Sequence, residues 1–157
     1  MSMQDYEAAR EIMAQYPERL HFVGPRPESL VKAAEMKLGL RFPPTYRRFL
    51  LEYGAGSFGG SEFYGVVHKN FEESGVPDAI WFTLSERKEW ALPHDLIVVY
   101  VPGNGELFCL DIGAKGDSES PVIAYDSAYP HEAQRREVIA KDFGEFLLEF
   151  VRREVNE

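Results

Sequence analysis

The first third of the chain carries three stripes of apolar residues at helical spacing. In each stripe the apolar side chains recur every three or four residues, so they share one face of a helix. Pro17 stops the first helix, Pro27 opens the second and Gly39 stands just past its end. A proline pair at 43–44 opens the third helix, which Gly54 follows. The stripes consist of Tyr6, Ala9, Met13 and Tyr16, then Leu30, Val31, Ala34 and Leu38, then Tyr46, Phe49, Leu50 and Tyr53.

The middle of the chain predicts strands. Residues 62–67 mix aromatic and β-branched side chains, which strands favour. Residues 96–101 are apolar at every position, so we expect an inner strand that is covered on both faces. A Pro-Gly-Asn-Gly turn at 102–105 then predicts that residues 107–111 return as an antiparallel neighbour. A further strand is expected at 122–126, after a polar loop.

The last residues predict a covering helix. Asp142 and Glu145 stand three residues apart, as in a capping box, where each side chain satisfies a free backbone donor. Residues 77–91 are ambiguous, and a short helix around Leu84 is one interpretation. The apolar stripe of the closing helix must lie on the sheet or on the early helices, and it consists of Phe143, Phe146, Leu147, Phe150 and Val151.

This order of elements predicts an α+β fold. We expect N-terminal helices, a central and mainly antiparallel β-sheet, and a C-terminal helix packed on the core. The chain has 157 residues, the length of an ordinary domain, and shows neither an internal repeat nor a linker. Residues 1–157 are therefore expected to form a single domain.

Two motifs suggest chemistry, but their contexts do not fit it. Residues 54–59 match G-x-G-x-x-G, yet they follow a predicted helix and open a strand, the reverse of the order that a dinucleotide site needs. Cys109 lies between apolar neighbours in a predicted strand, where cysteine is usually a small buried hydrophobe rather than a nucleophile with His94 as its base. The four histidines stand far apart, and no second histidine follows His131-Glu132 at Arg135, so we expect no metal site and no cofactor.

The acidic charge is concentrated in the middle of the sequence. Residues 54–134 hold thirteen acidic and four basic side chains, a net charge of −9 that equals the net charge of the whole chain. Such a field repels nucleic acid and anionic membranes and attracts basic partners. Solubility alone is the simpler explanation of the same charge. A further possibility is a hydrolase that uses two of these carboxylates in a closed pocket. The candidates are Glu72, Glu73, Asp78, Glu86 and Glu106.

Aromatic residues among the acids favour a protein interface, because interfaces are enriched in aromatic anchors. We expect a basic partner to dock on this segment, with Tyr64 and Trp81 as anchors. The expected partner contacts are Glu62, Tyr64, Glu72, Glu73, Asp78, Trp81, Glu86 and Glu106.

The composition predicts a cytoplasmic protein. There is one cysteine, so no intramolecular disulfide can form, and a reducing compartment suits a lone thiol. The amino terminus has early acidic residues and no apolar run of signal-peptide length. The longest apolar run is far too short to cross a bilayer.

An ordered series of sequence blocks resembles the SUKH superfamily, the Smi/Knr type of domain. The blocks are LGLRFPPTYRRFLLEYGAGSFG at 38–59, LPHDLIVVYVPGNGELFCLD at 92–111, PVIAYD at 121–126 and a terminal helix with Phe-x-x-Phe-Leu at 143–147. The resemblance spans roughly residues 25–151 and is strongest to the bacterial YobK and YxxD antitoxins.

This resemblance implies an immunity protein without catalysis, which binds the nuclease domain of a cognate polymorphic toxin and occludes its active site. The binding surfaces of the superfamily vary with the toxin, so no motif transfers contact residues to this chain. A fungal branch acts as an interaction hub in cell-wall regulation, and a regulatory interaction module of that type is the alternative. The oligomeric state and the identity of the toxin stay open.

Overall fold

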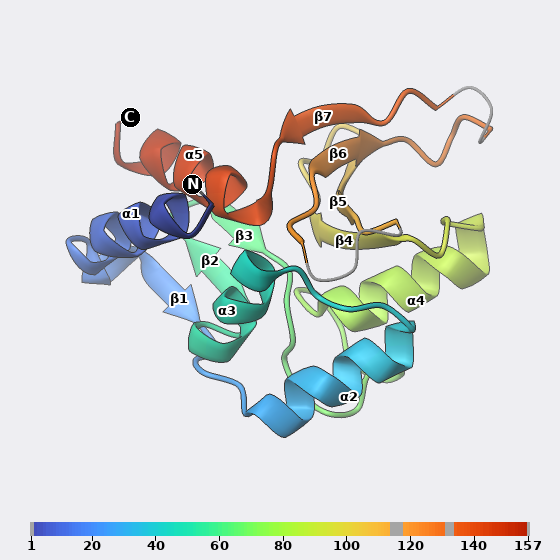
Figure 1. Ribbon diagram of the computed structural model, residues 1–157, viewed down its shortest axis with the longest axis horizontal. Helices are drawn as coiled ribbons and strands as arrows, with labels where there is room; N and C mark the ends of the chain where they lie inside the picture. The colour runs from blue at the N-terminus through green and yellow to red at the C-terminus, as the bar shows by residue number, and fades with distance from the viewer. Residues whose placement is uncertain (1, 114–117, 131–133, 157) are drawn as a thin grey trace.

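The computed structural model describes residues 2–113, 118–130 and 134–156, and its architecture is α+β (Figure 1). The three predicted N-terminal helices are present, and a 3-10 turn, η1 (Pro17–Arg19), follows the first of them. The ambiguous stretch 77–91 forms a full helix rather than a short one. The helices are α1 (Ser2–Ala14), α2 (Glu28–Leu38), α3 (Pro44–Glu52), α4 (Ala79–Trp90) and α5 (Phe143–Val155).

The strands form two antiparallel sheets where we expected one. Strands β1, β2 and β3 make a small sheet in that order, and β4 to β7 make a second sheet in sequence order. Strands β1, β2 and β7 were not predicted, and of the strand predicted at 62–67 only residues 62 and 63 lie in β3. The bounds are β1 (Leu20–Phe22), β2 (Gly56–Phe58), β3 (Ser61–Phe63), β4 (Leu96–Tyr100), β5 (Leu107–Asp111), β6 (Val122–Tyr125) and β7 (Glu137–Ala140).

Strand β4 differs from its prediction in one respect. Its side chains are buried on both faces, as expected, but the strand lies at the edge of its sheet and not inside it. Other elements cover that edge: the Tyr64 N–H donates to the Val99 carbonyl at 2.8 Å, and the Val98 N–H donates to the Thr83 hydroxyl at 3.0 Å. A continuous run of apolar residues therefore indicates that a strand is buried, but not whether it lies inside the sheet or at its edge.

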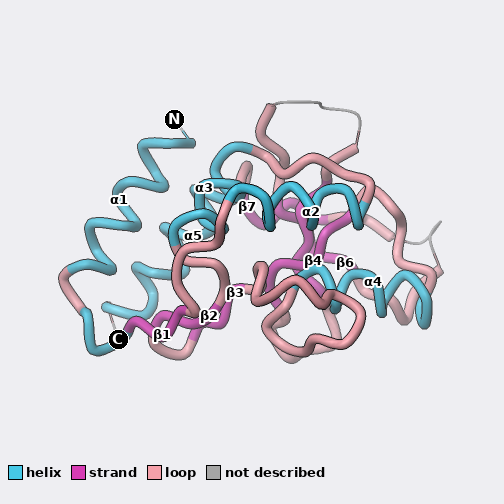
Figure 2. The backbone as a smooth tube through the Cα atoms, turned by 90° about the horizontal axis from the view of Figure 1, so that it is seen from below, coloured by secondary structure: helices cyan, strands magenta, loops and turns pink. Residues whose placement is uncertain are grey.

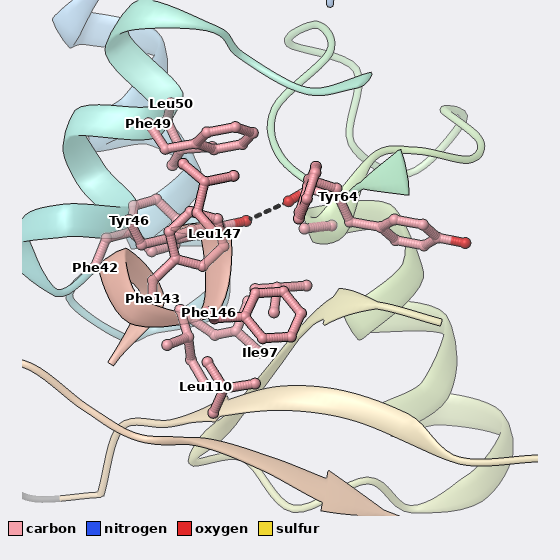
Figure 3. Close-up of a cluster of buried hydrophobic side chains, with 14 of the residues drawn as sticks. Phe42, Tyr46, Phe49, Leu50, Tyr64, Ile97, Leu110, Phe143, Phe146 and Leu147 are labelled. Carbon is pink, nitrogen blue, oxygen red and sulfur yellow. Dashed lines mark hydrogen bonds between the residues drawn. The ribbon is translucent and has the colours of Figure 1, made fainter. Parts of the chain in front are cut away.

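The core lies where helices α1, α3 and α5 meet the sheets. Its centre is a group of buried aromatic rings from α3 and α5, including Phe49, Phe143 and Phe146 (Figure 3). A smaller apolar cluster lies on the other face of the second sheet, where α4 contacts β4. This cluster contains Leu92, Cys109, Ile123 and Tyr125, among others.

Aspartates cap the two later helices. Asp142 accepts from the Glu145 N–H at 2.9 Å, and Glu145 in turn accepts from the Lys141 N–H at 2.8 Å. Each side chain of the predicted capping box therefore accepts a backbone N–H, as expected. The Glu145 carboxylate accepts the N–H of Lys141, which precedes the cap residue Asp142, and not that of Asp142 itself. Asp78 caps α4, and its carboxylate accepts from two backbone N–H groups.

The glycine-rich run is architectural. It follows α3, and its residues Gly56–Phe58 form strand β2. At Gly56, φ is +141°, and a Cβ there would lie 2.3 Å from the carbonyl oxygen of His21 on β1. Glycine is required at this position because the two strands approach closely.

Candidate partner-binding surface

The eight predicted contact residues do not form one surface. Asp78 is 0% exposed and Tyr64 is 5% exposed, so neither can contact a partner, and both predictions were wrong. Glu62 is exposed on β3, and Glu106 lines a separate hollow together with Tyr129. Glu86 is half-buried on α4, while Glu72, Glu73 and Trp81 are at least partly exposed.

Tyr64 is buried because it packs among residues of α3, α4 and β4. Its ring contacts Phe82 edge to face, with centroids 5.4 Å apart. Its carbonyl accepts a hydrogen bond from the Tyr46 hydroxyl at 2.9 Å, which Figure 3 draws as a dashed line. The sequence around a tyrosine that is flanked by acidic residues does not indicate whether its side chain faces solvent or the core.

Asp78 is buried because it caps a helix. One carboxylate oxygen accepts from the Ile80 N–H at 2.9 Å and from the Trp81 N–H at 3.0 Å. A sequence signal existed, since aspartate is a preferred cap residue. It became readable only once a helix was known to begin at Ala79.

Glu72 and Trp81 line one groove, and its other lining residues come from α2, the segment after β3 and α4. Figure 1 shows α2 and α4 next to each other, and Figure 2 shows the same two helices from below. The groove has a volume of about 530 Å³, and aromatic, aliphatic and charged side chains line it. Lys37 on α2 bonds Glu72 across it, with 3.3 Å between ammonium and carboxylate. The groove is lined by Lys37, Phe71, Glu72, Trp81, Leu84, Ser85, Lys88 and Glu89.

Of the eight residues that line the groove, only Glu72 and Trp81 were among the predicted contacts. Trp81, Ser85 and Lys88 recur at helical spacing, so one side of α4 could have been read from the sequence once the helix was assigned. The contribution of Lys37 could not, because nothing in the sequence reports that α2 lies beside α4.

The acidic charge of residues 54–134 does not appear as one patch. Arg136 pairs with Asp95 at 3.1 Å and with Asp111 at 3.3 Å, and Lys37 pairs with Glu72. Glu119 accepts from the Thr45 N–H at 2.9 Å at the start of α3. Cations and helix ends from other parts of the chain therefore neutralise several of these acids, and the groove itself carries two charges of each sign.

Burial raises the pKa of Asp78 in spite of the backbone N–H groups that its carboxylate accepts. Between the ordinary and the raised pKa, the folded protein binds more protons than the unfolded chain, so this group lowers stability as pH rises through that window. We expect the stability of the wild type, measured relative to Asp78→Asn, to increase from pH 7 to pH 5. Urea unfolding at both pH values measures this difference, and a decrease would contradict the assignment.

The candidate catalytic groups are not assembled. Cys109 is buried, and burial raises the pKa of its thiol well above the usual range. The carboxylates proposed for a hydrolase are dispersed: Glu72 is ion-paired in the groove, Asp78 is under α4, and Glu106 lines another hollow. Over the described residues, no three histidine, cysteine or acidic side chains are grouped to hold a metal ion. His131 and Glu132 lie outside the described residues.

Cys109 is expected to be chemically inert. In the native protein, a thiol reagent should label it at least about 100-fold more slowly than in the urea-unfolded chain, because the reactive thiolate is scarce and shielded. Cys109→Ser should leave partner binding unchanged at temperatures where the variant stays folded. Fast labelling of native protein, together with loss of binding in the variant, would contradict this expectation.

Comparisons with known proteins agree with this architecture. The family model SUKH_6, described as SMI1-KNR4 cell-wall, matches residues 28–147. The chain belongs to this family and therefore to the SUKH superfamily, which includes immunity proteins and whose domains are generally non-catalytic.

A crystal structure of a protein from Pseudomonas syringae pv. tomato has the same fold, with a TM-score of 0.56 and 15% sequence identity. The match covers 80% of this chain and 89% of that one. No match is found among curated proteins. None of the helices in the described part of the chain has the length and apolar character to cross a membrane.

Proposed function

We propose that this protein is a non-enzymatic, cytoplasmic immunity protein, which binds the nuclease domain of a cognate bacterial toxin and occludes its active site. Membership of the SUKH superfamily is the observation that carries the proposal. The net charge of −9 supports it, because nucleases bind polyanions and tend to be basic around their active sites. The dispersed catalytic candidates favour binding over chemistry.

The toxin docks on the groove between α2 and α4, with Trp81 as its central anchor. Trp81 is half-buried on a helix that is capped at its start and packed on β4, so its position is fixed before binding. The charged residues around it, Glu72 and Lys37 among them, form a polar rim like that of protein interfaces. Long-range attraction comes from the net charge of the whole molecule, because the groove itself is balanced.

The test is binding kinetics against the nuclease toxin encoded beside the gene. Trp81→Ala should speed dissociation by about 30-fold, the effect of losing an anchor of roughly 2 kcal/mol. Trp90→Ala is the matched control: Trp90 is on the same helix and is 60% exposed, but it does not line the groove. Equal effects of the two substitutions, or no effect of Trp81→Ala, would remove the groove from the proposal.

Charge gives an independent arm of the same test. The double variant Glu72→Lys, Glu73→Lys should slow association, and added salt should slow association of the wild type, since exposed charges are screened over ~8 Å at physiological ionic strength. Association that is independent of salt, with full protection by the double variant, would contradict electrostatic steering.

A regulatory interaction module is the second candidate, and the cell-wall description of the matching family favours it. Such a module would bind a housekeeping protein in cells that lack the toxin. A toxin gene directly upstream, with a product that binds this protein, favours immunity. Binding of a cell-wall enzyme and of no toxin favours the module.

A further inference from the structure

We propose that Asp78 is a positioning residue for the docking groove, because its carboxylate holds the backbone of Trp81 at the point where the segment that carries Phe71 and Glu72 ends. The expected effect on toxin binding rests on the proposed function. The expected effect on the position of Trp81 does not.

The first contact is with the anchor itself. The Asp78 carboxylate, which is 0% exposed, accepts a hydrogen bond from the Trp81 backbone N–H at 3.0 Å, while the Trp81 side chain lines the groove. The same oxygen accepts from the Ile80 N–H, and the Ile80 side chain is fully buried. The first turn of α4 is therefore fixed both to the carboxylate and to the core.

The second set of contacts consists of backbone bonds that hold the segment after β3. Phe71 and Glu72 belong to the segment between Gly65 and Asp78, and backbone bonds close that segment at its two ends. The Ala79 N–H donates to the Gly65 carbonyl at 2.7 Å, and the Gly65 N–H donates to the Pro77 carbonyl at 3.0 Å. The Asp78 N–H donates to the Gly75 carbonyl at 2.7 Å.

Two of the three elements that line the groove, the segment and α4, thus meet at Asp78. Loss of the Asp78 carboxylate frees the two backbone N–H groups at the start of α4, next to the backbone bonds that close the segment. Trp81 should then sample more than one position, and the partner should meet a less ordered surface. A less ordered surface binds more slowly and more weakly, because the partner must order it during binding.

The chain provides a matched control. Asp142 is also a buried helix cap, and its carboxylate accepts from the Glu145 N–H at 2.9 Å. It caps α5, which lies at the opposite end of the molecule from α4 (Figure 1). Loss of either carboxylate removes one helix cap, but only the loss of Asp78 should disturb the groove.

The first measurement needs no partner. In a Trp90→Phe background, acrylamide quenching of fluorescence reports the exposure of Trp81 alone. Asp78→Ala should raise the quenching constant about twofold, and Asp142→Ala should leave it unchanged, since only the first frees the helix turn that holds Trp81. Asp78→Asn, which keeps an acceptor for both amides, should restore the wild-type value, and Asp78→Gly, which also lacks the acceptor, replaces the alanine variant if that one does not fold.

The second measurement uses the toxin. Asp78→Ala should raise Kd by about tenfold, mainly through slower association, while Asp142→Ala changes it less than about twofold. Equal quenching in the two alanine variants, or an unchanged Kd in Asp78→Ala, would overturn the inference. Failure of the wild type to bind any toxin would instead overturn the proposed function, and the quenching result would then stand by itself.

Discussion

Replacement of Phe146 with Ala is expected to lower the free energy of unfolding by about 3–5 kcal/mol, as is usual for a fully buried ring. Phe146 is 0% exposed and lies on α5, where that helix meets both sheets. Its ring centroid is 4.5–6.1 Å from those of Phe63, Tyr100, Phe108, Phe143 and Phe150.

Urea unfolding measures this loss. Phe49→Ala should show a similar loss, because Phe49 is equally buried in the same cluster. Met36→Ala is the surface control: Met36 is 83% exposed, and its truncation should change stability by less than about 0.5 kcal/mol. A loss below about 1 kcal/mol at both phenylalanines would mean that the faces of α3 and α5 are misassigned.

Gly65→Ala is expected to lower stability by about 3 kcal/mol or more, at the upper end of over-packing, because the obstructing atom belongs to the backbone. A Cβ at Gly65 would lie 1.8 Å from the carbonyl oxygen of Gly54 and 2.9 Å from a methyl carbon of Leu50. That carbonyl also accepts the Val66 N–H at 3.0 Å. To make room, the chain must break the bond that joins the glycine-rich run to the segment after β3.

Gly75→Ala is the control for this substitution. A Cβ at Gly75 would meet nothing within 4 Å, and Gly75 lies in the same segment. Thermal or urea unfolding of the two variants compares them directly. If both alanine variants are as stable as the wild type, the close approach at Gly65 does not exist in solution.

The helices could be predicted from the sequence because their signals are local. The stripes that contain Tyr46, Phe49 and Leu50 on α3, and Phe143, Phe146 and Leu147 on α5, are buried as the helical period requires. The proline pair at 43–44 and Gly39 lie at helix ends, where their backbone preferences place them. Such patterns need no knowledge of the rest of the chain.

The sheets could be predicted only in part, because pairing is not local. The turn at 102–105 correctly joined β4 to β5, whereas nothing near β1 reports that it pairs with β2. Strand β4 can lie at the edge of its sheet because Tyr64 and Thr83, from other parts of the sequence, form hydrogen bonds with its backbone.

The docking surface could be predicted least. The sequence placed Glu72 and Trp81 among the candidates, and the structure brings these two into one groove. It also placed Asp78 and Tyr64 there, although both are buried. Charge summed along a segment reports composition, and the ion pairs from Lys37 and Arg136 that neutralise it come from outside the segment.

Inhibition of the purified toxin tests whether the protein neutralises a nuclease by covering its active site, as we propose. Nuclease activity is measured while the protein is added, at several concentrations of nucleic acid substrate. We expect complete inhibition at a stoichiometric amount of the protein, competition with the substrate, and a Trp81→Ala variant that needs a higher concentration than Trp90→Ala. Full nuclease activity in the presence of excess protein, for a toxin encoded beside it, would show that the protein does not act as a nuclease inhibitor.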